Sequence, residues 1–457
     1  MAFKNKIGLL DLTMLVISFV IGMGIFRTPA NVAAASPTSF VFFMSWVAGG
    51  LVALCGALTY AEIGSRLPVT GGYYKVISYA YHPSVAFAIN CIILVSNAAS
   101  SAAVALVGSE YITGVLFPAS SDPVLMHQAT IAEQARLIHI VIAIASIFIF
   151  YGVNMLGLRL SARTQTILTI IKISLILLLI TPLFFATGNS NTIPAITTVH
   201  DQAILEYVKA FGVGLVAVSF TFGGYQQTIN LGADVERPGK NIPRGIFMGI
   251  FVIVVLYLLI NYAYVKVIGF ETLKTSKNIA AIMASKIFGI NAERILSVLL
   301  FLGVLAYING QLMSNPRVMY AMSEDKLLPA FLKQKNRKGA LKWSVSLFAA
   351  LAALVVFWAK EFDTILSFTI FLDSFGMALS AGSIFILRKR TAHMDGSDIY
   401  KMKLYPLLPL IFIASYLFVA LSIAADNYKT ALTGIAVFSG FLVIYFLVYK
   451  KQNKPQS

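Results

Sequence analysis

Charged residues are scarce in this sequence. Only 12% of its 457 residues are Asp, Glu, Lys or Arg, whereas a soluble domain has about 25%. Hydrophobic residues make up 58% of the chain, and the mean hydropathy is +0.82. So few charged side chains cannot cover the surface of a chain of this size in water. The composition therefore excludes an ordinary soluble protein and predicts that lipid is the solvent.

Cysteine and histidine are equally few. The 2 cysteines, Cys55 and Cys91, both fall within long apolar segments, so we expect small buried residues and not a disulfide pair or a metal site. The 5 histidines are scattered without the spacing of metal ligands. The sequence has no HExxH motif, nucleophile–base pair or metal-ligand cluster. It therefore predicts neither a cofactor nor an enzyme.

Long apolar segments, in contrast, are abundant. A helix needs about 20 apolar residues to cross a bilayer. Twelve segments are candidates: residues 9–35, 40–63, 84–114, 136–157, 162–186, 207–232, 243–268, 293–322, 343–359, 363–388, 403–424 and 430–449. They predict an all-α integral membrane protein with 12 transmembrane helices and no soluble domain between them. The polar residues 450–457 are predicted to form a cytoplasmic tail.

Positive charge exceeds negative charge, with 35 Lys and Arg against 19 Asp and Glu, a formal net charge of +16. The positive residues gather in alternate loops, notably residues 326–342 and 388–403. This distribution follows the positive-inside rule if both termini are cytoplasmic. We therefore expect a multi-pass protein of the cell's inner (plasma) membrane. Topology and attraction to anionic lipid explain the charge, and no nucleic-acid partner is expected.

Two of the apolar segments are interrupted at their centres. The run IGMGIF at residues 21–26 places two glycines two residues apart, and Pro29 follows. Glycine is a poor helix former, and unpaired backbone at membrane depth is tolerated only against protein or a wet cavity. The pair Gly223-Gly224 interrupts the sixth segment in the same way. Breaks five segments apart fit an inverted repeat of five helices plus five, with the binding site at the breaks.

Four motifs in order along the chain resemble the amino acid–polyamine–organocation (APC) transporter superfamily. They are IGMGIFRTP, YAEIGSRLPVTGGYY, FTFGGYQQTINLGADVERPGKNIPRGI and NGQLMSNPRVMYAMSEDKLLP, in or after the first, second, sixth and eighth segments. The sequence is similar to bacterial amino-acid permeases, including the serine–threonine exchanger-like branch, and to the L-type amino acid transporters. The resemblance implies the APC fold. Its parts would be a first repeat over residues 1–186, a second over 207–388, and two extra C-terminal helices within 403–449.

The resemblance also implies that an amino acid binds at the two breaks. The half-helix that begins near Ile25 would offer N–H groups to a carboxylate. The half-helix that ends near Phe222 would offer carbonyl groups to an ammonium. The predicted substrate-binding residues are Ile21, Gly22, Met23, Gly24, Ile25, Phe220, Thr221, Phe222, Gly223, Tyr264 and Tyr307. In the L-type branch an aromatic residue at the position of Phe220 is the gate.

Lys172 lies deep in the fifth segment. Because a lysine at the bilayer centre costs roughly 2.5–3.5 kcal/mol on insertion scales, it needs partners. The resemblance implies that its ammonium replaces a sodium ion and bridges the first break to the eighth helix, so sodium should not be required. Four residues depart from the family pattern. Met23 and Gly303 stand where small or serine residues are common, Tyr307 where a smaller residue is common, and Gln226 where one relative has an acid. The partner of Lys172 on the eighth helix is therefore open.

We therefore expect a secondary active transporter of neutral L-amino acids that works by alternating access, as an exchanger or a proton symporter. A cationic amino acid or polyamine permease is the alternative. It would need acidic pocket residues, for which only Asp373 is a candidate. For Asp373, substrate contact, proton handling and a structural hydrogen bond all remain open.

Three further expectations concern partners and structure. A membrane sensor that binds an amino acid is the alternative of another class, and it should carry an appended soluble domain. Glu62 is expected to form a structural salt bridge or to cap a helix. No disulfide-linked heavy chain is expected, because the predicted outer loop between the third and fourth helices has no cysteine.

Overall fold

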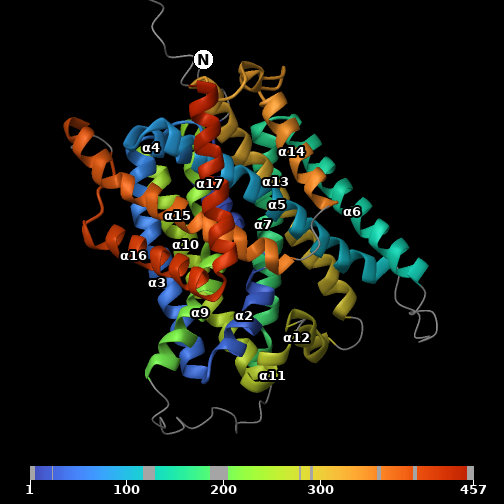
Figure 1. Ribbon diagram of the computed structural model, residues 1–457. Helices are drawn as coiled ribbons and strands as arrows, with labels where there is room; N and C mark the ends of the chain where they lie inside the picture. The colour runs from blue at the N-terminus through green and yellow to red at the C-terminus, as the bar shows by residue number, and fades with distance from the viewer. Residues whose placement is uncertain are drawn as a thin grey trace, which may run out of the picture.

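The computed structural model describes residues 6–22, 24–116, 129–185, 204–276, 279–288, 292–357, 362–394 and 399–449. The described chain is helical throughout (Figure 1). Strand-like pairing in these residues is confined to three isolated bridges, Ile7 with Val235, Thr70 with Leu231, and Lys335 with Leu341.

The long helices follow the predicted apolar segments. They are α1 (Leu9–Val20), α2 (Gly24–Ala35), α3 (Ser39–Arg66), α5 (Pro83–Leu116), α6 (Ala129–Met155), α7 (Leu158–Ile180), α9 (Ile204–Phe222), α10 (Pro238–Ile268), α13 (Ala292–Glu324), α14 (Lys342–Val356), α15 (Phe362–Arg390), α16 (Leu407–Asp426) and α17 (Tyr428–Tyr449). Shorter helices are α4 (Gly72–Ala80), α8 (Pro182–Phe185), α11 (Phe270–Thr275) and α12 (Ile279–Phe288). Figure 1 shows α4 at the end that carries the N-terminus, and α2, α9, α11 and α12 toward the opposite end.

Within the described residues, eight helices are long and apolar enough to cross a membrane, or nine if α1 and α2, which meet at 42°, form one span. Shorter apolar helices cover Ala210–Ser219, Lys342–Val356 and Ala431–Leu447, in three further predicted segments. The all-helical membrane architecture therefore agrees with the sequence. The count of 12 spans, the five-plus-five repeat and the domain boundaries stay predictions.

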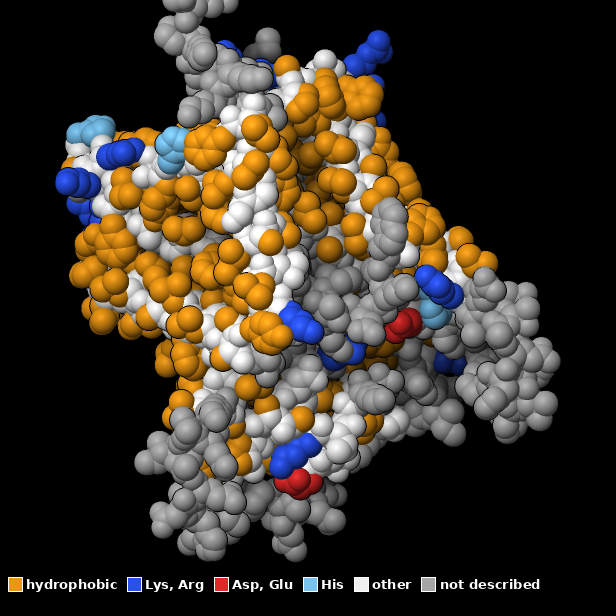
Figure 2. All heavy atoms as spheres, in the orientation of Figure 1, with side chains coloured by type: hydrophobic (Ala, Val, Ile, Leu, Met, Phe, Trp, Pro, Cys, Tyr) orange, Lys and Arg blue, Asp and Glu red, His pale blue; other side chains and the backbone are white. Residues whose placement is uncertain are grey.

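The surface of the helical bundle is apolar. Figure 2 shows a broad band of hydrophobic side chains, with charged side chains mainly beyond its two edges. Large side chains are exposed on helices throughout the chain, among them Leu10 (65%), Phe251 (53%) and Leu421 (69%). Exposed apolar area on this scale marks an interaction surface, and lipid is the partner that the hydropathy predicts. Both cysteines are free.

Two segments differ from the prediction. In the sixth apolar segment, α9 ends at Phe222, where the sequence predicts a break, but the part after the break forms a 3₁₀ helix, η2 (Tyr225–Asn230), and not a second α-helical half. The physical cause is Gly224, whose φ of 111° cannot continue a right-handed helix. The interval between the predicted segments 243–268 and 293–322 also contains two helices, α11 and α12.

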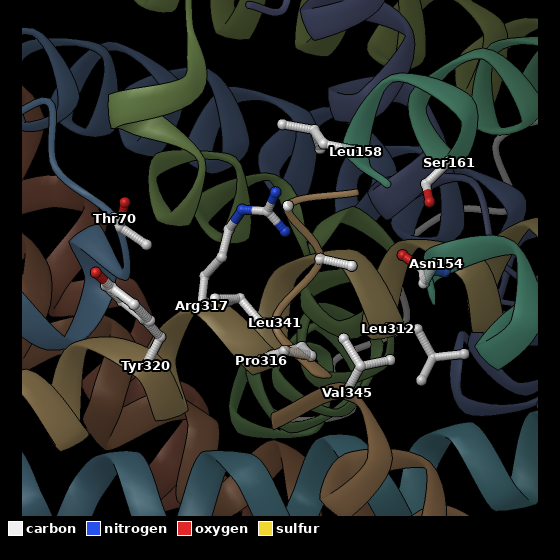
Figure 3. Close-up of a pocket in the computed structure, with 12 residues that line it drawn as sticks. Thr70, Asn154, Leu158, Ser161, Leu312, Pro316, Arg317, Tyr320, Leu341 and Val345 are labelled. Carbon is white, nitrogen blue, oxygen red and sulfur yellow. The ribbon is translucent and has the colours of Figure 1, made fainter. Parts of the chain in front are cut away.

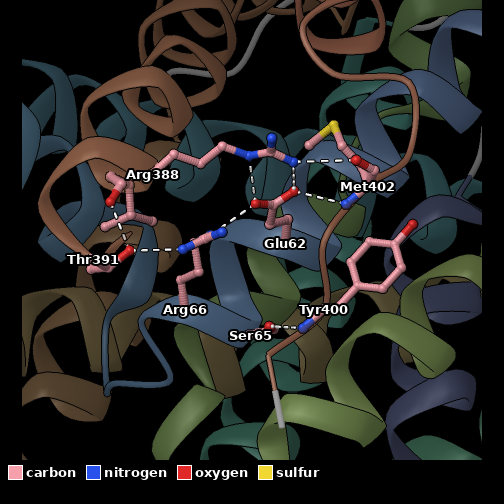
Figure 4. Close-up of polar contacts among 8 residues, drawn as sticks. Glu62, Ser65, Arg66, Arg388, Thr391, Tyr400 and Met402 are labelled. Carbon is pink, nitrogen blue, oxygen red and sulfur yellow. Dashed lines mark hydrogen bonds and ion pairs between the residues drawn. The ribbon is translucent and has the colours of Figure 1, made fainter. Parts of the chain in front are cut away.

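A buried ion cluster joins α3 to α15 (Figure 4). Oε1 of the fully buried Glu62 accepts hydrogen bonds from Nε of Arg66 (2.8 Å) and Nε of Arg388 (2.7 Å). Oε2 accepts from Nη2 of Arg388 (2.6 Å) and from the N–H of Met402 (2.9 Å). Each carboxylate oxygen thus has two donors. The structural salt bridge expected at Glu62 is confirmed.

We expect Glu62→Gln to destabilise the fold, because it leaves two arginines without their counter-charge. Removing one partner of a buried ion pair costs about 3–5 kcal/mol. Thermal unfolding of the purified protein should show this loss as a lower melting temperature. The matched control is Lys274→Gln, which breaks a pair whose carboxylate, Glu271, is 79% exposed, and it should melt with the parent. A Glu62→Gln protein that also melts with the parent would contradict the structural role.

Candidate functional site

The first break separates α1 from α2. The N–H of Ile21 still donates to Ile17 O (2.8 Å), but the N–H of Gly22 turns back to Val20 O (2.8 Å). The α-helix begins again at Gly24. The first N–H groups of α2 have no partner within the helix, as at any helix N-terminus. Met23, which the sequence places at the centre of the break, lies outside the described residues.

The second break separates α9 from η2. The N–H of Gly224 donates to the side-chain oxygen of Gln226 at 2.8 Å. Gln226 therefore caps the start of η2, a role that the sequence did not reveal. The Phe222 ring packs against Trp46 (6.1 Å between ring centroids) and Tyr257 (5.1 Å). This predicted site residue turns its side chain away from the break, so only its backbone is available there.

The two breaks touch each other. A Cβ atom added at Gly24 would lie only 3.1 Å from Oγ1 of Thr221, in the last turn of α9. A Cβ atom added at Gly224 would collide with the carbonyl oxygen of Phe19, near the end of α1. Glycine at both positions therefore permits the close approach of the two chains. The N-terminus of α2 and the C-terminus of α9 consequently meet inside the bundle.

Lys172 of α7 reaches the end of α1. Its side chain is buried, and Nζ donates to the carbonyl oxygens of Ile21 (2.5 Å) and Ser18 (3.2 Å). The C-terminal end of a helix carries partial negative charge, which stabilises an ammonium. The expected contact with the first break is thus present. On α13, Gly303 lies beside the lysine's alkyl chain, since a Cβ added there would lie 3.8 Å from Lys172 Cγ.

The remaining predicted residues divide into two groups. Tyr307 is partly buried, and a Cβ added at Gly22 would lie 4.0 Å from its ring. Ile21, Ile25 and Tyr264 are fully buried, and the Tyr264 hydroxyl has no hydrogen-bond partner among the described residues. Tyr307 therefore lies at the first break, whereas the isoleucine side chains serve packing. The side chain of Phe220 lies outside the described residues.

A chain of buried amides next to Lys172 escaped the sequence analysis. Gln165 donates to the Ser18 hydroxyl and to Ala306 O (2.9 Å). Asn309 donates to the Gln165 side-chain oxygen (2.5 Å) and accepts from Asn154 (2.8 Å). A signal was present, because Ser161, Gln165, Thr169 and Lys172 follow one another at intervals of three or four residues in α7. Such spacing puts polar side chains on one face of a helix.

Asp373 of α15 is partly buried. None of the residues that the structure describes forms a hydrogen bond or an ion pair with its carboxylate. Its charge nevertheless lies within electrostatic reach of Tyr307 at the first break and of Tyr225 at the start of η2. The structural hydrogen bond considered for Asp373 is therefore not found in this part of the chain. In the same described residues, no three His, Cys, Asp or Glu side chains form a metal-binding group.

Comparison with known proteins places this chain in a family. Residues 7–451 match the family described as amino acid permease. The serine/threonine exchanger SteT of Bacillus subtilis is 27% identical over 454 residues, 98% of each chain. The human cystine/glutamate transporter is 26% identical over 457 residues, 99% of this chain and 87% of the relative. The mouse large neutral amino acids transporter small subunit 2 is 24% identical over 461 residues, 100% of this chain and 83% of the relative. Since the family match spans nearly the whole sequence, this chain belongs to the amino acid permease family.

Proposed function

We propose that the protein is a sodium-independent secondary transporter of neutral L-amino acids, which exchanges substrates or carries them with a proton. The family match and the similarity to a serine/threonine exchanger and a neutral amino acid transporter support an amino acid as the substrate. The crossing of the two breaks supports the position of the site. Where the two breaks meet, helix ends of opposite partial charge lie close together. A small zwitterion suits such a place, because it carries one charge for each helix end.

The observation that carries the proposal is that one end of each break already has a side-chain partner within the protein. At the first break, Lys172 neutralises the carbonyl end of α1, so the positive N-terminus of α2 is unopposed. At the second, Gln226 caps the N-terminal end of η2, so the negative C-terminus of α9 is unopposed. A carboxylate is then favoured at α2 and an ammonium at α9. The two ends are adjacent at Gly24 and Thr221, as the two charges of an amino acid require.

Alternating access would follow from movement of the broken helices relative to their neighbours. In this mechanism Ile21 to Ile25, Thr221 to Gly223, Tyr264 and Tyr307 surround the substrate, and Phe220 closes over it. We further propose that both termini are cytoplasmic, in the cell's inner membrane, and that no disulfide-linked heavy chain is needed.

One observation favours the second candidate, a permease for cationic amino acids. In the described part of the bundle, the Asp373 carboxylate has no hydrogen-bond or ion-pair partner, and it lies within electrostatic reach of Tyr307. An intramembrane acid of this kind is a functional-site hypothesis by default. The ionised Asp373 carboxylate would attract a cationic side chain. The protonated carboxyl group, or a carboxylate that accepts a hydrogen bond from a substrate hydroxyl, would equally suit a neutral amino acid.

A competition panel in proteoliposomes tests the proposed substrate. We expect unlabelled neutral L-amino acids to reduce uptake of labelled serine or leucine, and their methyl esters to have no effect. The ester lacks the carboxylate that α2 is proposed to bind. Effective competition by the esters would contradict a carboxylate site at the first break.

The same panel separates the two candidates at Asp373. If lysine and ornithine compete best, and Asp373→Asn abolishes only their competition, the cationic alternative replaces the neutral one. If Asp373→Asn leaves the ranking of neutral amino acids unchanged while the cationic ones remain inactive, the neutral assignment stands. The Glu271→Gln variant changes a 79% exposed carboxylate and serves as the matched control.

Uptake in sodium and in choline buffers tests the role of Lys172. We expect equal uptake by the parent in both buffers, and a loss of about tenfold or more in Lys172→Met, because two buried carbonyls lose a charged donor. We expect uptake by Lys172→Met to stay low in sodium buffer. Recovery of uptake in sodium would mean that the ion occupies the place of the ammonium. Lys274→Met, at a lysine whose ion-pair partner Glu271 is 79% exposed, is the control for loss of charge alone. A strict sodium requirement in the parent would refute the proposal.

A further inference from the structure

Three of the sequence motifs converge at the end of the bundle that carries the N-terminus, called here the inner end. Thr70, in the segment between α3 and α4, forms a bridge with Leu231, and the N–H of Gly71 donates to Asn230 O (2.9 Å). The Asn230 side chain donates to the Ser314 hydroxyl of α13 (2.9 Å). The segment after the second break is thus enclosed by the other two motifs. The proposed binding of substrate at the two breaks does not use these contacts.

The same segment is tied to the start of α1. The N–H of Ile7 donates to Asp234 O (2.8 Å), and the N–H of Glu236 donates to Ile7 O (3.0 Å). At the far end of α1, Gly224 lies against Phe19. Helix α1 therefore contacts the segment 224–236 at both of its ends. We call α1 and the segment 224–236, which these contacts join, the inner half-site.

One buried ion pair joins the inner half-site to α13. Asp234 is 1% exposed, and its Oδ2 accepts from Nε of Arg317 at 2.8 Å. Its Oδ1 is buried and has no hydrogen-bond partner among the described residues. The contrast is Glu62, where four donors saturate both oxygens. A buried carboxylate with an unpaired oxygen retains part of its desolvation cost, which water removes when the pair opens.

A cavity of about 30 Å³ lies beside Arg317. Figure 3 shows Arg317 among its lining residues, which include Thr70, Asn154, Ser161 and Tyr320. A cavity of this size has room for about two water molecules. Asn154 also belongs to the chain of buried amides that leads through Asn309 and Gln165 to Ser18, whose carbonyl binds Lys172. A polar route therefore connects the cavity with the first break.

We propose that the Arg317–Asp234 ion pair is the latch that closes the inner exit, and that the cavity beside it is the narrow part of the exit path. When the pair separates, the inner half-site moves away from α13 as one body and the cavity widens. Arg317 and Asp234 are thus positioning residues for transport. The inference rests on the proposed transport function, since an exit is needed only if a substrate passes through.

Thiol labelling tests the latch without any substrate. Ser161→Cys places a reporter in the cavity, where the serine is 1% exposed and its hydroxyl bonds only backbone carbonyls. The background is the protein with Cys55→Ala and Cys91→Ala, in lipid nanodiscs. We expect Asp234→Asn to raise the rate of maleimide labelling about threefold or more, through a shift toward the open state. The matched control is Lys75→Gln, which breaks an inner-end pair with Asp325 that is 25% and 34% exposed, and it should label at the parent rate.

Several results would overturn the proposal. One is labelling of Asp234→Asn at the parent rate, and another is an equal acceleration in Lys75→Gln. If Asp234→Asn is not recovered from membranes, Arg317→Lys keeps the charge but not the guanidinium geometry, and it should label faster than the parent. The exchanged pair Asp234→Arg with Arg317→Asp should return toward the parent rate. Because labelling uses no substrate, its failure would leave the competition results intact, and a failed competition panel would leave the latch intact.

Discussion

The contact between the Lys172 ammonium and the last carbonyls of α1 is the interaction on which the rest of the site depends. A break in a membrane helix exposes two ends of opposite sign, and the carbonyl end of α1 lies only a few residues from the N–H end of α2. Without a cation, the negative potential of the α1 carbonyl end and the positive potential of the α2 N–H end would largely cancel. Lys172 neutralises one of them, so the break favours an anion. The lysine is in turn stable at membrane depth because those carbonyls replace its water.

Much of this arrangement could be predicted from the sequence, because it follows from local chemistry. Glycines in the middle of two apolar segments indicate where helices end, and a lysine deep in a third segment requires an acceptor nearby. The direction of Phe222 and the cap by Gln226 could not be predicted. They depend on side-chain packing against α3 and on the φ of Gly224, which is set by its contact with Phe19. The partner of Asp234 lies 83 residues away in the sequence, and no periodicity within one helix reveals such a pair.

Two buried carboxylates at the same end of the bundle illustrate how the fold separates fixed parts from moving ones. Glu62 has four donors, and these come from its own helix, from α15 and from the chain that precedes α16. Asp234 has one side-chain donor, on α13. A saturated carboxylate gains nothing from water, whereas an unsaturated one does. The helices that Glu62 joins are therefore suited to form a scaffold, and the junction at Asp234 is suited to open.

Helix α7 holds α1 through two side chains, Gln165 of the chain of buried amides and Lys172. Gln165 bonds the Ser18 hydroxyl while Lys172, two turns further along α7, bonds the Ser18 carbonyl. Any displacement of α1 that separates Asp234 from Arg317 must also disturb these contacts, because α1 is tied to Asp234 through Ile7. The proposed substrate site between α2 and α9 lies next to the other end of α1, where Gly224 packs against Phe19. The two proposals together predict that binding at the breaks and closure of the inner end are coupled through α1, which contacts both regions.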